Sequence, residues 1–384
     1  MRFVFNDVEY DDKKILTLFS DFTANCFFFK TESFHKFINN TKFNDISLID
    51  WLKRVDENLK VENVEFQKND KLFENLRDIV IEFFNSISTK LGTTVKSILE
   101  KSNQNYKIEI VNTGKNRTQI HPKIDYIKIL FNLSDDTLPF YIQIPHELSH
   151  AVSSFQTKSI EYTKKIKNEK DKDKKKSLQN KFDLFNKHIA KYEVKAINEI
   201  ESFIVEKLYI KFLYDKNIIT KEEFENYFKD RLSGVKHQLE EILEENEILN
   251  HLNYRSTIDE CKSYISYIHK TKDEKRFWYL IERIIWMSEE ANDTNEYPIC
   301  SQYLINYVLA EIVSRVWFDK YENSSDTEQS EMIKNFTKYL SNAYNLNLEK
   351  ANTFLLNQDF AKTIEDFINL INKNNDLTLK NQLL

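Results

Sequence analysis

The sequence contains the segment FYIQIPHELSHAV, from Phe140 to Val152, which carries two histidines four residues apart. Apolar residues on both sides of the histidines predict one continuous helix. Residues four apart lie on the same face of a helix, so His146 and His150 can reach one metal ion through their ring nitrogens. Glu147 lies about 100° further round the helix, where it can hold a water molecule at that ion without easily taking a ligand position.

These three residues suit the hydrolysis of a peptide bond. A zinc ion lowers the pKa of a bound water molecule to about 7. A neighbouring carboxylate can take the proton as the carbonyl is attacked and pass it to the leaving amine. The three fixed positions arise by chance on the order of one time in a hundred, and the alternative is two histidines packed on a helix surface. We therefore predict a zinc-dependent metallopeptidase with Glu147 as the general base.

A third protein ligand is expected, because a catalytic zinc ion usually has three of them and a water molecule. The best candidate is Glu199, in the helical segment 196–206, where acids interrupt an apolar stripe. Such an acid is costly unless it is paired or bound to a metal. Glu206 follows two turns later on the same face and can orient a ligand histidine through its free ring N–H. Either acid could instead be an ordinary surface residue, and Glu201 is the alternative to both.

The composition predicts a mainly α fold. The chain has only three Gly and four Pro in 384 residues, and sheets and tight turns consume both residue types. Segment 71–99 repeats apolar residues at helical steps, with Gly92 expected to kink or end a helix. Residues 108–111 and 126–133 are short and rich in β-forming residues, so we expect a small sheet.

We expect three regions along the chain: an N-terminal helical region at 1–105, a catalytic core at 106–325 and a C-terminal helical region at 326–384. Within the core, segment 162–187 is the most charged stretch, and we expect it to be a solvated helix or helical hairpin that projects from the body. A basic arm for nucleic acid or anionic lipid is the alternative, which the interspersed acids and the absence of aromatic residues from the run 163–176 weaken.

Charge and hydropathy exclude several classes of protein. The net charge of −6 gives no overall basic field that would point to nucleic acid. No stretch of 18 or more apolar residues and no apolar leader are visible. We therefore expect no membrane insertion and a cytoplasmic location, with export by a route without a cleaved signal still open.

The remaining cysteines and histidines are expected to have structural or surface roles. The cysteines form no CxxC pair, suit a reducing compartment and are expected to be small buried hydrophobes: Cys26, Cys261 and Cys300. Six histidines outside the motif are expected to be exposed or structural: His35, His121, His188, His237, His251 and His269.

Segments 129–133, 137–138 and 146–152 together resemble the thimet oligopeptidase and oligoendopeptidase F family of gluzincin metallopeptidases. In that family an edge strand precedes the zinc helix by a similar gap. Segment 198–206 is similar to the family's third-ligand helix, in which a Glu is followed three residues later by Ser and seven residues later by Glu. Segment 303–312 resembles the helix that carries a substrate-contacting tyrosine.

The resemblance implies a zincin-like, mostly helical fold with a small sheet at the active-site cleft and helices on both sides. It implies that zinc is bound by His146, His150 and Glu199. Strand 126–133 would line the cleft and pair with an extended peptide through main-chain hydrogen bonds. A tyrosine would donate a hydrogen bond to the oxyanion, although most of the 19 tyrosines must serve the core or the surface. The candidates, in order, are Tyr307, Tyr303 and Tyr297.

The sequence also departs from the family pattern. From His150 to Glu199 the spacing is 199 − 150 = 49 residues, well above the family's usual spacing, and segment 162–187 accounts for the excess as an insertion. The family's Gly-rich substrate loop is not recognisable, and residues 295–298 stand in its place, so no substrate preference is predicted. The sequence also predicts no oligomeric state.

Three functions therefore stay open. The first is an oligopeptidase-like endopeptidase that acts on peptide substrates. The second is a dedicated protease, such as a toxin or secreted effector, that cuts one protein partner. The third is a catalytically silent zincin-fold binding protein, against which the intact Glu147 counts, because a pure binder has no need of a general base.

Overall fold

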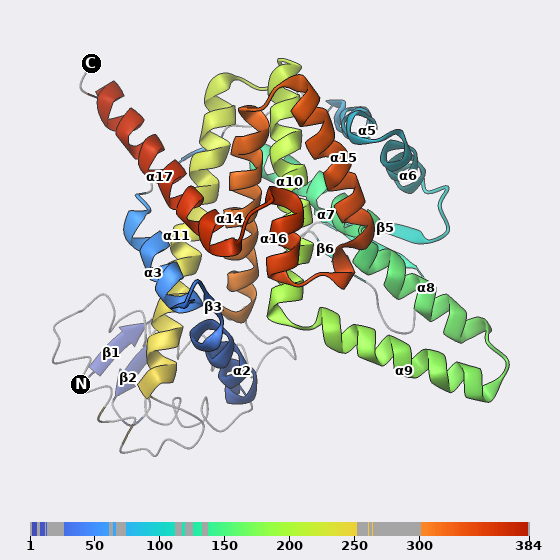
Figure 1. The fold of residues 1–384 in the computed structure, drawn as a ribbon, viewed down its shortest axis with the longest axis horizontal. Helices are drawn as coiled ribbons and strands as arrows, with labels where there is room; N and C mark the ends of the chain where they lie inside the picture. Colours follow the sequence, from blue (N-terminus) through green and yellow to red (C-terminus); the bar gives the residue numbers. More distant parts are fainter. Residues whose placement is uncertain are drawn as a thin grey trace. The chain divides into compact units, whose positions relative to one another are not determined.

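The computed structural model describes residues 2–5, 8–11, 13, 27–60, 64–66, 74–111, 117–119, 126–132, 137–251, 260, 263 and 301–382 (Figure 1). Within these ranges the chain is mainly α-helical, with three small sheets. This confirms the fold class expected from the scarcity of Gly and Pro. None of the described helices is long and apolar enough to cross a membrane.

The chain divides into two compact units, and the first combines Met1–Glu57 with Lys236–Ile305. The indole Nε1 of Trp51, buried in this unit, donates to the carbonyl oxygen of Phe43 at 3.1 Å. Lys236 and Asp56 form an ion pair at 2.8 Å. The elements of this unit are β1 (Arg2–Phe5), β2 (Val8–Asp11), α2 (Phe27–Asn40), β3 (Lys42–Phe43), β4 (Ile46–Ser47), α3 (Leu48–Asn58) and the second half of α11 (Lys221–His251).

The second unit, Asn58–Val235 with Asn306–Leu384, contains the histidine motif. The expected division into residues 1–105, 106–325 and 326–384 stays a prediction. The elements of this unit are α5 (Leu76–Ile87), α6 (Thr89–Leu99), β5 (Tyr106–Val111), β6 (Arg117–Gln119), β7 (Ile127–Asn132), α7 (Leu138–Val152), α8 (Ser154–Asn168), α9 (Lys172–Ile189), α10 (Tyr192–Asp215), the start of α11, most of α14 (Ser301–Glu322), α15 (Asp326–Asn342), the 3-10 turn η1 (Ala343–Asn345), α16 (Leu348–Leu356) and α17 (Phe360–Gln382).

The sheet of the second unit has the strand order β5-β7-β6, in which β5 runs parallel and β6 antiparallel to β7. The expectation that strand 126–133 is an edge strand was therefore wrong, because β7 is paired on both sides. The strand that displaces it from the edge is β6, whose residues are all polar. The hydroxyl of Thr118 on β6 donates to the carbonyl oxygen of Glu147 at 2.8 Å, so β6 lies directly against the motif helix.

Helix α7 carries the motif through the interior of the unit. Thr137 precedes it in an extended conformation, and Pro139 lies in its first turn, where a missing N–H costs nothing. The helix continues through Pro145, which removes only one backbone hydrogen bond. It packs against α10 (Figure 1), and the hydroxyls of two buried serines, Ser149 and Ser202, meet there at 2.7 Å. Small side chains at this contact allow the two helices to approach closely.

Helices α5 and α6 form a tight pair. The break between the two helices is at Ser88, whose backbone is extended. Gly92, by contrast, lies buried inside α6. The expectation that Gly92 kinks or ends a helix was wrong. A Cβ at Gly92 would lie 2.8 Å from the Cα of Asn85, so the glycine is needed for the close approach of the two helices.

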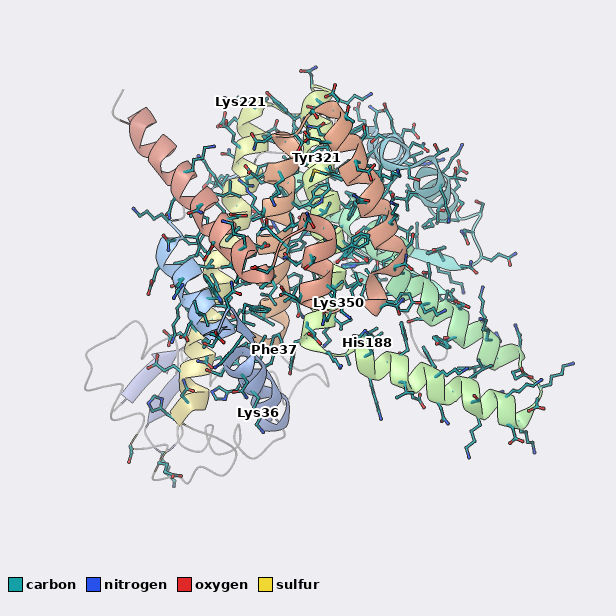
Figure 2. All side chains as sticks on the ribbon, in the orientation of Figure 1. Lys36, Phe37, His188, Lys221, Tyr321 and Lys350 are labelled. Atoms are coloured by element: carbon teal, nitrogen blue, oxygen red, sulfur yellow. The ribbon has the colours of Figure 1, made fainter. Side chains whose placement is uncertain are left out.

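The charged segment forms the hairpin of α8 and α9, which extends away from the rest of the second unit (Figure 1). Aromatic rings pack along the hairpin and at its base. The ring centroids of Tyr162 and Phe182 are 5.6 Å apart, and those of Phe185 and Tyr344 are 5.9 Å apart. Figure 2 shows side chains pointing outward from both helices, with His188 labelled; its Nε2 lies 2.9 Å from the carbonyl oxygen of Tyr344. The role of this hairpin as an insertion stays a prediction.

Candidate metal centre

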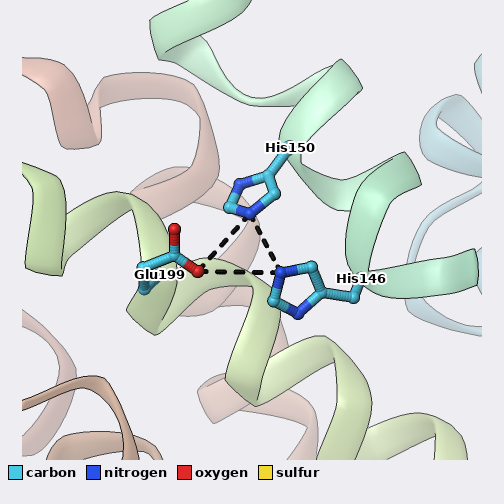
Figure 3. Close-up of side chains that lie close together, drawn as sticks. All are labelled: His146, His150 and Glu199. Atoms are coloured by element: carbon cyan, nitrogen blue, oxygen red, sulfur yellow. Dashed lines mark hydrogen bonds and ion pairs between the residues drawn. The ribbon is translucent and has the colours of Figure 1, made fainter. Parts of the chain in front are cut away.

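Three potential metal ligands converge between α7 and α10: His146, His150 and Glu199 (Figure 3). The Nε2 atoms of the two histidines are 3.1 Å apart. The carboxylate Oε2 of Glu199 lies 3.6 Å from Nε2 of His146 and 3.5 Å from Nε2 of His150. Helical spacing puts the two histidines on one face of α7, and the packing of α10 against α7 supplies the acid.

The shape of this group suits a small metal ion. Ligand atoms 2.0–2.1 Å from a tetrahedral zinc ion lie about 3.3 Å from one another, and the three separations here bracket that value. The Oε2 atom of Glu199 is buried and has no hydrogen-bond partner among the described residues. Two imidazoles and a carboxylate form a donor set that zinc prefers, so the residues fit a zinc ion, and the three side chains could hold one.

Glu206 fixes the ring of His146 from behind. Its Oε1 lies 2.6 Å from Nδ1 of His146. Burial raises the pKa of Glu206, but the charge of Arg231 and the hydrogen bond to His146 outweigh burial and lower the pKa to about 2. A charged carboxylate accepts the Nδ1 proton, which leaves Nε2 of His146 as the nitrogen that faces the other two ligands.

The ionisation of the ligands follows from the same contacts. Burial lowers the pKa of His146, but the hydrogen bond and the charge of Glu206 raise it to about 9, so a metal ion that binds Nε2 must displace a proton from it. Burial also raises the pKa of Glu199, yet the charge of His150, whose Nε2 lies 3.5 Å from the carboxylate, brings it below its ordinary value. The carboxylate of Glu199 is therefore charged, as a metal ligand must be.

His150 is oriented by a serine on α10. The hydroxyl oxygen of Ser202 lies 3.1 Å from Nδ1 of His150. Ser202 in turn accepts a hydrogen bond from the hydroxyl of Ser149, which lies one residue before His150. The sequence shows Ser202 three residues after Glu199, but nothing in that spacing assigned it this contact.

Glu147 lies at the edge of the candidate metal centre. Its side chain is buried, and its Oε2 has no hydrogen-bond partner among the described residues. A buried carboxylate oxygen without a partner costs free energy that something must offset. Its main chain is fixed, because the carbonyl oxygen accepts the Thr118 hydroxyl. Its side chain is therefore available for a proton or a water molecule.

Tyr307 lies near this group through an aromatic contact. Its ring stacks on Phe203, with centroids 6.0 Å apart, and Phe203 lies 5.8 Å from the ring of His146. The charge of Glu199, followed by burial, raises the pKa of Tyr307, so its hydroxyl keeps its proton. The side chain of Tyr303 and all of Tyr297 lie outside the described residues.

Glu201 points elsewhere. It is fully buried, does not belong to the ligand group, and neither of its carboxylate oxygens has a hydrogen-bond partner in the described part of the chain. Burial and the charge of Glu199 raise its pKa well above the ordinary value. Two residues along a helix is about 200° of rotation, which carries Glu201 away from the face that bears Glu199.

A buried charged network that no sequence pattern predicted lies behind Glu206. The hydroxyl of Tyr227 on α11 donates to Oε2 of Glu206 at 2.7 Å. Arg231, one turn further along α11, places Nε 3.8 Å from the same oxygen and 3.6 Å from Glu311. Glu311 also pairs with Lys207 at 2.7 Å, and both side chains are fully buried. No spacing rule links these residues, because they come from three separate helices.

The other described histidines belong to no further ligand group within the described part of the chain. The side chain of His237 is exposed, and its Nε2 lies 3.1 Å from Oε1 of Glu241. The Nε2 of His35 lies 2.8 Å from Oδ1 of Asn250. The following lie outside the described residues: Cys26, His121, Cys261, His269, the segment 295–298 and Cys300.

No protein-family model matches the chain, and no curated protein matches it significantly in sequence. A solved structure with some likeness is that of a protein from Bacillus anthracis str. Ames, provisionally assigned as an oligoendopeptidase F. The TM-score is 0.46 and the sequence identity 10%, over 94% of this chain and 56% of that one. The chain thus spans little more than half the length of that protein. At this degree of likeness, function rests on the residues of the site.

Proposed function

We propose that this protein is a zinc-dependent metallopeptidase of the oligopeptidase kind. The observation that carries the proposal is the convergence of three ligand atoms, from His146, His150 and Glu199, within 4.8 Å of one another. The buried carboxylate of Glu147, next to His146 in the chain, adds the group that peptide hydrolysis needs. The family resemblance of segments 146–152 and 198–206 agrees with this assignment.

Each residue has a chemical task in the proposed reaction. Zinc, when bound by the three ligands, would supply a Lewis acid that polarises the scissile carbonyl and lowers the pKa of water. Glu147 accepts the proton of the attacking water and delivers it to the leaving amine. Tyr307, which keeps its proton, donates a hydrogen bond to the carbonyl oxygen as negative charge develops there. Glu206 keeps the proton of His146 on Nδ1.

The substrate is proposed to be an extended peptide that lies along β6. This strand pairs only with β7 among the described strands, and it contacts α7 through Thr118. An extended chain can add to such an edge through main-chain hydrogen bonds. The central position of β7 excludes that strand from this role, so Arg117–Gln119 takes the place that the sequence suggested for residues 126–133.

The proposal is tested by measuring metal content and peptide cleavage together. Wild type and Glu147→Gln are purified, assayed for bound zinc and incubated with a mixed library of short peptides. We expect zinc in both proteins and cleavage by wild type alone, because the substitution removes the base and no ligand. Zinc in both with no cleavage by either would favour a protease for a single protein partner or a silent binder. Cleavage by Glu147→Gln would rule out the proposed mechanism.

A matched pair of substitutions tests the ligand set. Glu199→Ala should lower zinc occupancy, because it removes one of three ligands. Glu201→Ala, two residues away on the same helix and more deeply buried, should leave zinc occupancy unchanged. The reverse result would move the third ligand to Glu201.

A further inference from the structure

Glu206 uses its two carboxylate oxygens for different partners. Oε1 contacts Nδ1 of His146 at 2.6 Å, and Oε2 accepts the hydroxyl proton of Tyr227 at 2.7 Å. A carboxylate held at one oxygen can rotate about its last side-chain bond. A carboxylate held at both oxygens has a fixed plane, so the direction of the hydrogen bond to His146 is fixed as well.

Tyr227 and Arg231 reach Glu206 from the same face of α11, since they are four residues apart. Tyr227 is almost completely buried. The guanidinium carbon of Arg231 lies 4.0 Å above the ring of Phe203, and that ring lies 5.8 Å from His146. Arg231 therefore restrains Glu206 by charge and, at the same time, backs the aromatic ring that contacts the ligand histidine.

The charges around Glu206 also balance. Glu206 and Glu311 share the two cations Arg231 and Lys207, and three of these four side chains are at most 5% exposed. Buried charges of this kind are stable only when each is paired, because removing one partner leaves the other charge buried and unpaired. The network thus ties α10, α11 and α14 to one side of the ligand His146.

From these contacts we propose that Tyr227 and Arg231 are positioning residues for the metal ligand His146, acting through Glu206. They hold the carboxylate in the plane in which it fixes the imidazole, and so set the affinity and geometry of the metal centre. The inference rests on the proposed zinc site, and it extends that site to a helix that supplies no ligand.

The test measures zinc affinity by competition with a chromogenic chelator, and ligand geometry by the visible absorption bands of the cobalt(II)-substituted full chain. Tyr227→Phe, which removes one hydroxyl group, should weaken zinc binding by about tenfold, in the range usual for groups that orient a ligand. It should also shift the cobalt bands. Arg231→Gln should do the same, and Arg231→Lys should recover part of the loss because it keeps the charge.

Two controls separate positioning from packing. Tyr209→Phe removes the hydroxyl of another fully buried tyrosine, one with no hydrogen-bond partner among the described residues. It should change neither zinc affinity nor the cobalt spectrum. In a Glu206→Gln background, Tyr227→Phe should have less than about a twofold further effect, because its influence runs through Glu206.

Three outcomes overturn the inference. Wild-type zinc affinity and cobalt bands in Tyr227→Phe and Arg231→Gln, with only thermal stability reduced, would make both residues ordinary parts of the core. A raised KM for peptides with unchanged zinc affinity in the Arg231 variants would assign Arg231 to substrate binding. A wild-type protein that binds no zinc would overturn the proposed function itself, whereas the other two outcomes leave that function intact.

Discussion

At the scale of the residue, the task proposed for Tyr307 depends on one group, its hydroxyl. Its hydroxyl keeps its proton because the charge of Glu199 and burial raise its pKa. We expect Tyr307→Phe to lower kcat by about 10²–10³-fold, the loss usual for one oxyanion donor. KM and zinc content should change little, because the ring still stacks on Phe203. Steady-state kinetics with a peptide that wild type cleaves would measure this.

Tyr209→Phe serves again as the control, since its buried hydroxyl makes no hydrogen bond among the described residues. It should keep wild-type kcat. Unchanged kcat in Tyr307→Phe would contradict the assignment and leave Tyr303 as the next candidate from the sequence.

Helix geometry explains which site residues could be predicted. His146, His150 and Glu199 were candidates because one helical period and one acid in an apolar helical stripe sufficed to single them out. Their roles as ligands stay predictions, although their atoms lie within 4.8 Å of one another. Tyr227 and Arg231 could not be predicted, because their contact with Glu206 depends on how α11 packs against α10, and no local pattern records that packing.

At the scale of the element, the pair α5 and α6 depends on one missing side chain. A Cβ at Gly92 would lie 1.9 Å from the amide oxygen and 2.8 Å from the Cα of Asn85. The amide can rotate away, but the backbone cannot, so Gly92→Ala should lower the free energy of unfolding by about 1–3 kcal/mol. Urea denaturation followed by circular dichroism would measure the change.

Gly234, inside α11, is the matched control, because a Cβ added there would meet no other atom within 4 Å. Gly234→Ala should raise the free energy of unfolding by about 0.5–1 kcal/mol through helix propensity alone. Equal effects of the two substitutions would show that the close approach at Gly92 contributes nothing.

Elements were predictable from the sequence where hydrophobic periodicity is strong. The apolar segments of β5, β7 and α7 could be recognised in this way, whereas β6 could not, because Arg117–Gln119 has no apolar residue and is only three residues long. The prediction that Gly92 kinks or ends a helix was wrong for a related reason. A glycine at a helix–helix contact and a glycine at a helix end have the same local sequence signal, and only tertiary packing distinguishes them.

At the scale of the whole molecule, the proposed zinc site links metal binding to stability. A ligand that binds only the folded state at a thousandfold excess over its Kd raises the free energy of unfolding by about 4.1 kcal/mol. Thermal unfolding with added zinc should therefore show a higher Tm than unfolding with a chelator. His150→Ala should abolish the difference. An equal zinc effect in His150→Ala would locate the binding elsewhere.

The mainly α fold was predictable from composition, because the chain has few of the Gly and Pro residues that tight turns between strands favour. The division into two compact units was not. The first unit joins Met1–Glu57 to Lys236–Ile305, and no linker or change in composition marks such a discontinuous unit in the sequence.

The hairpin of α8 and α9 separates His150 from Glu199 by 49 residues, yet α7 and α10 pack directly against each other. The chain entropy lost on closing a loop grows only with the logarithm of its length, so each doubling costs about 0.6 kcal/mol. A hairpin that folds back on itself brings its own ends together and lowers that cost further. The hairpin can therefore lengthen or shorten over generations while the residues at its base keep their positions.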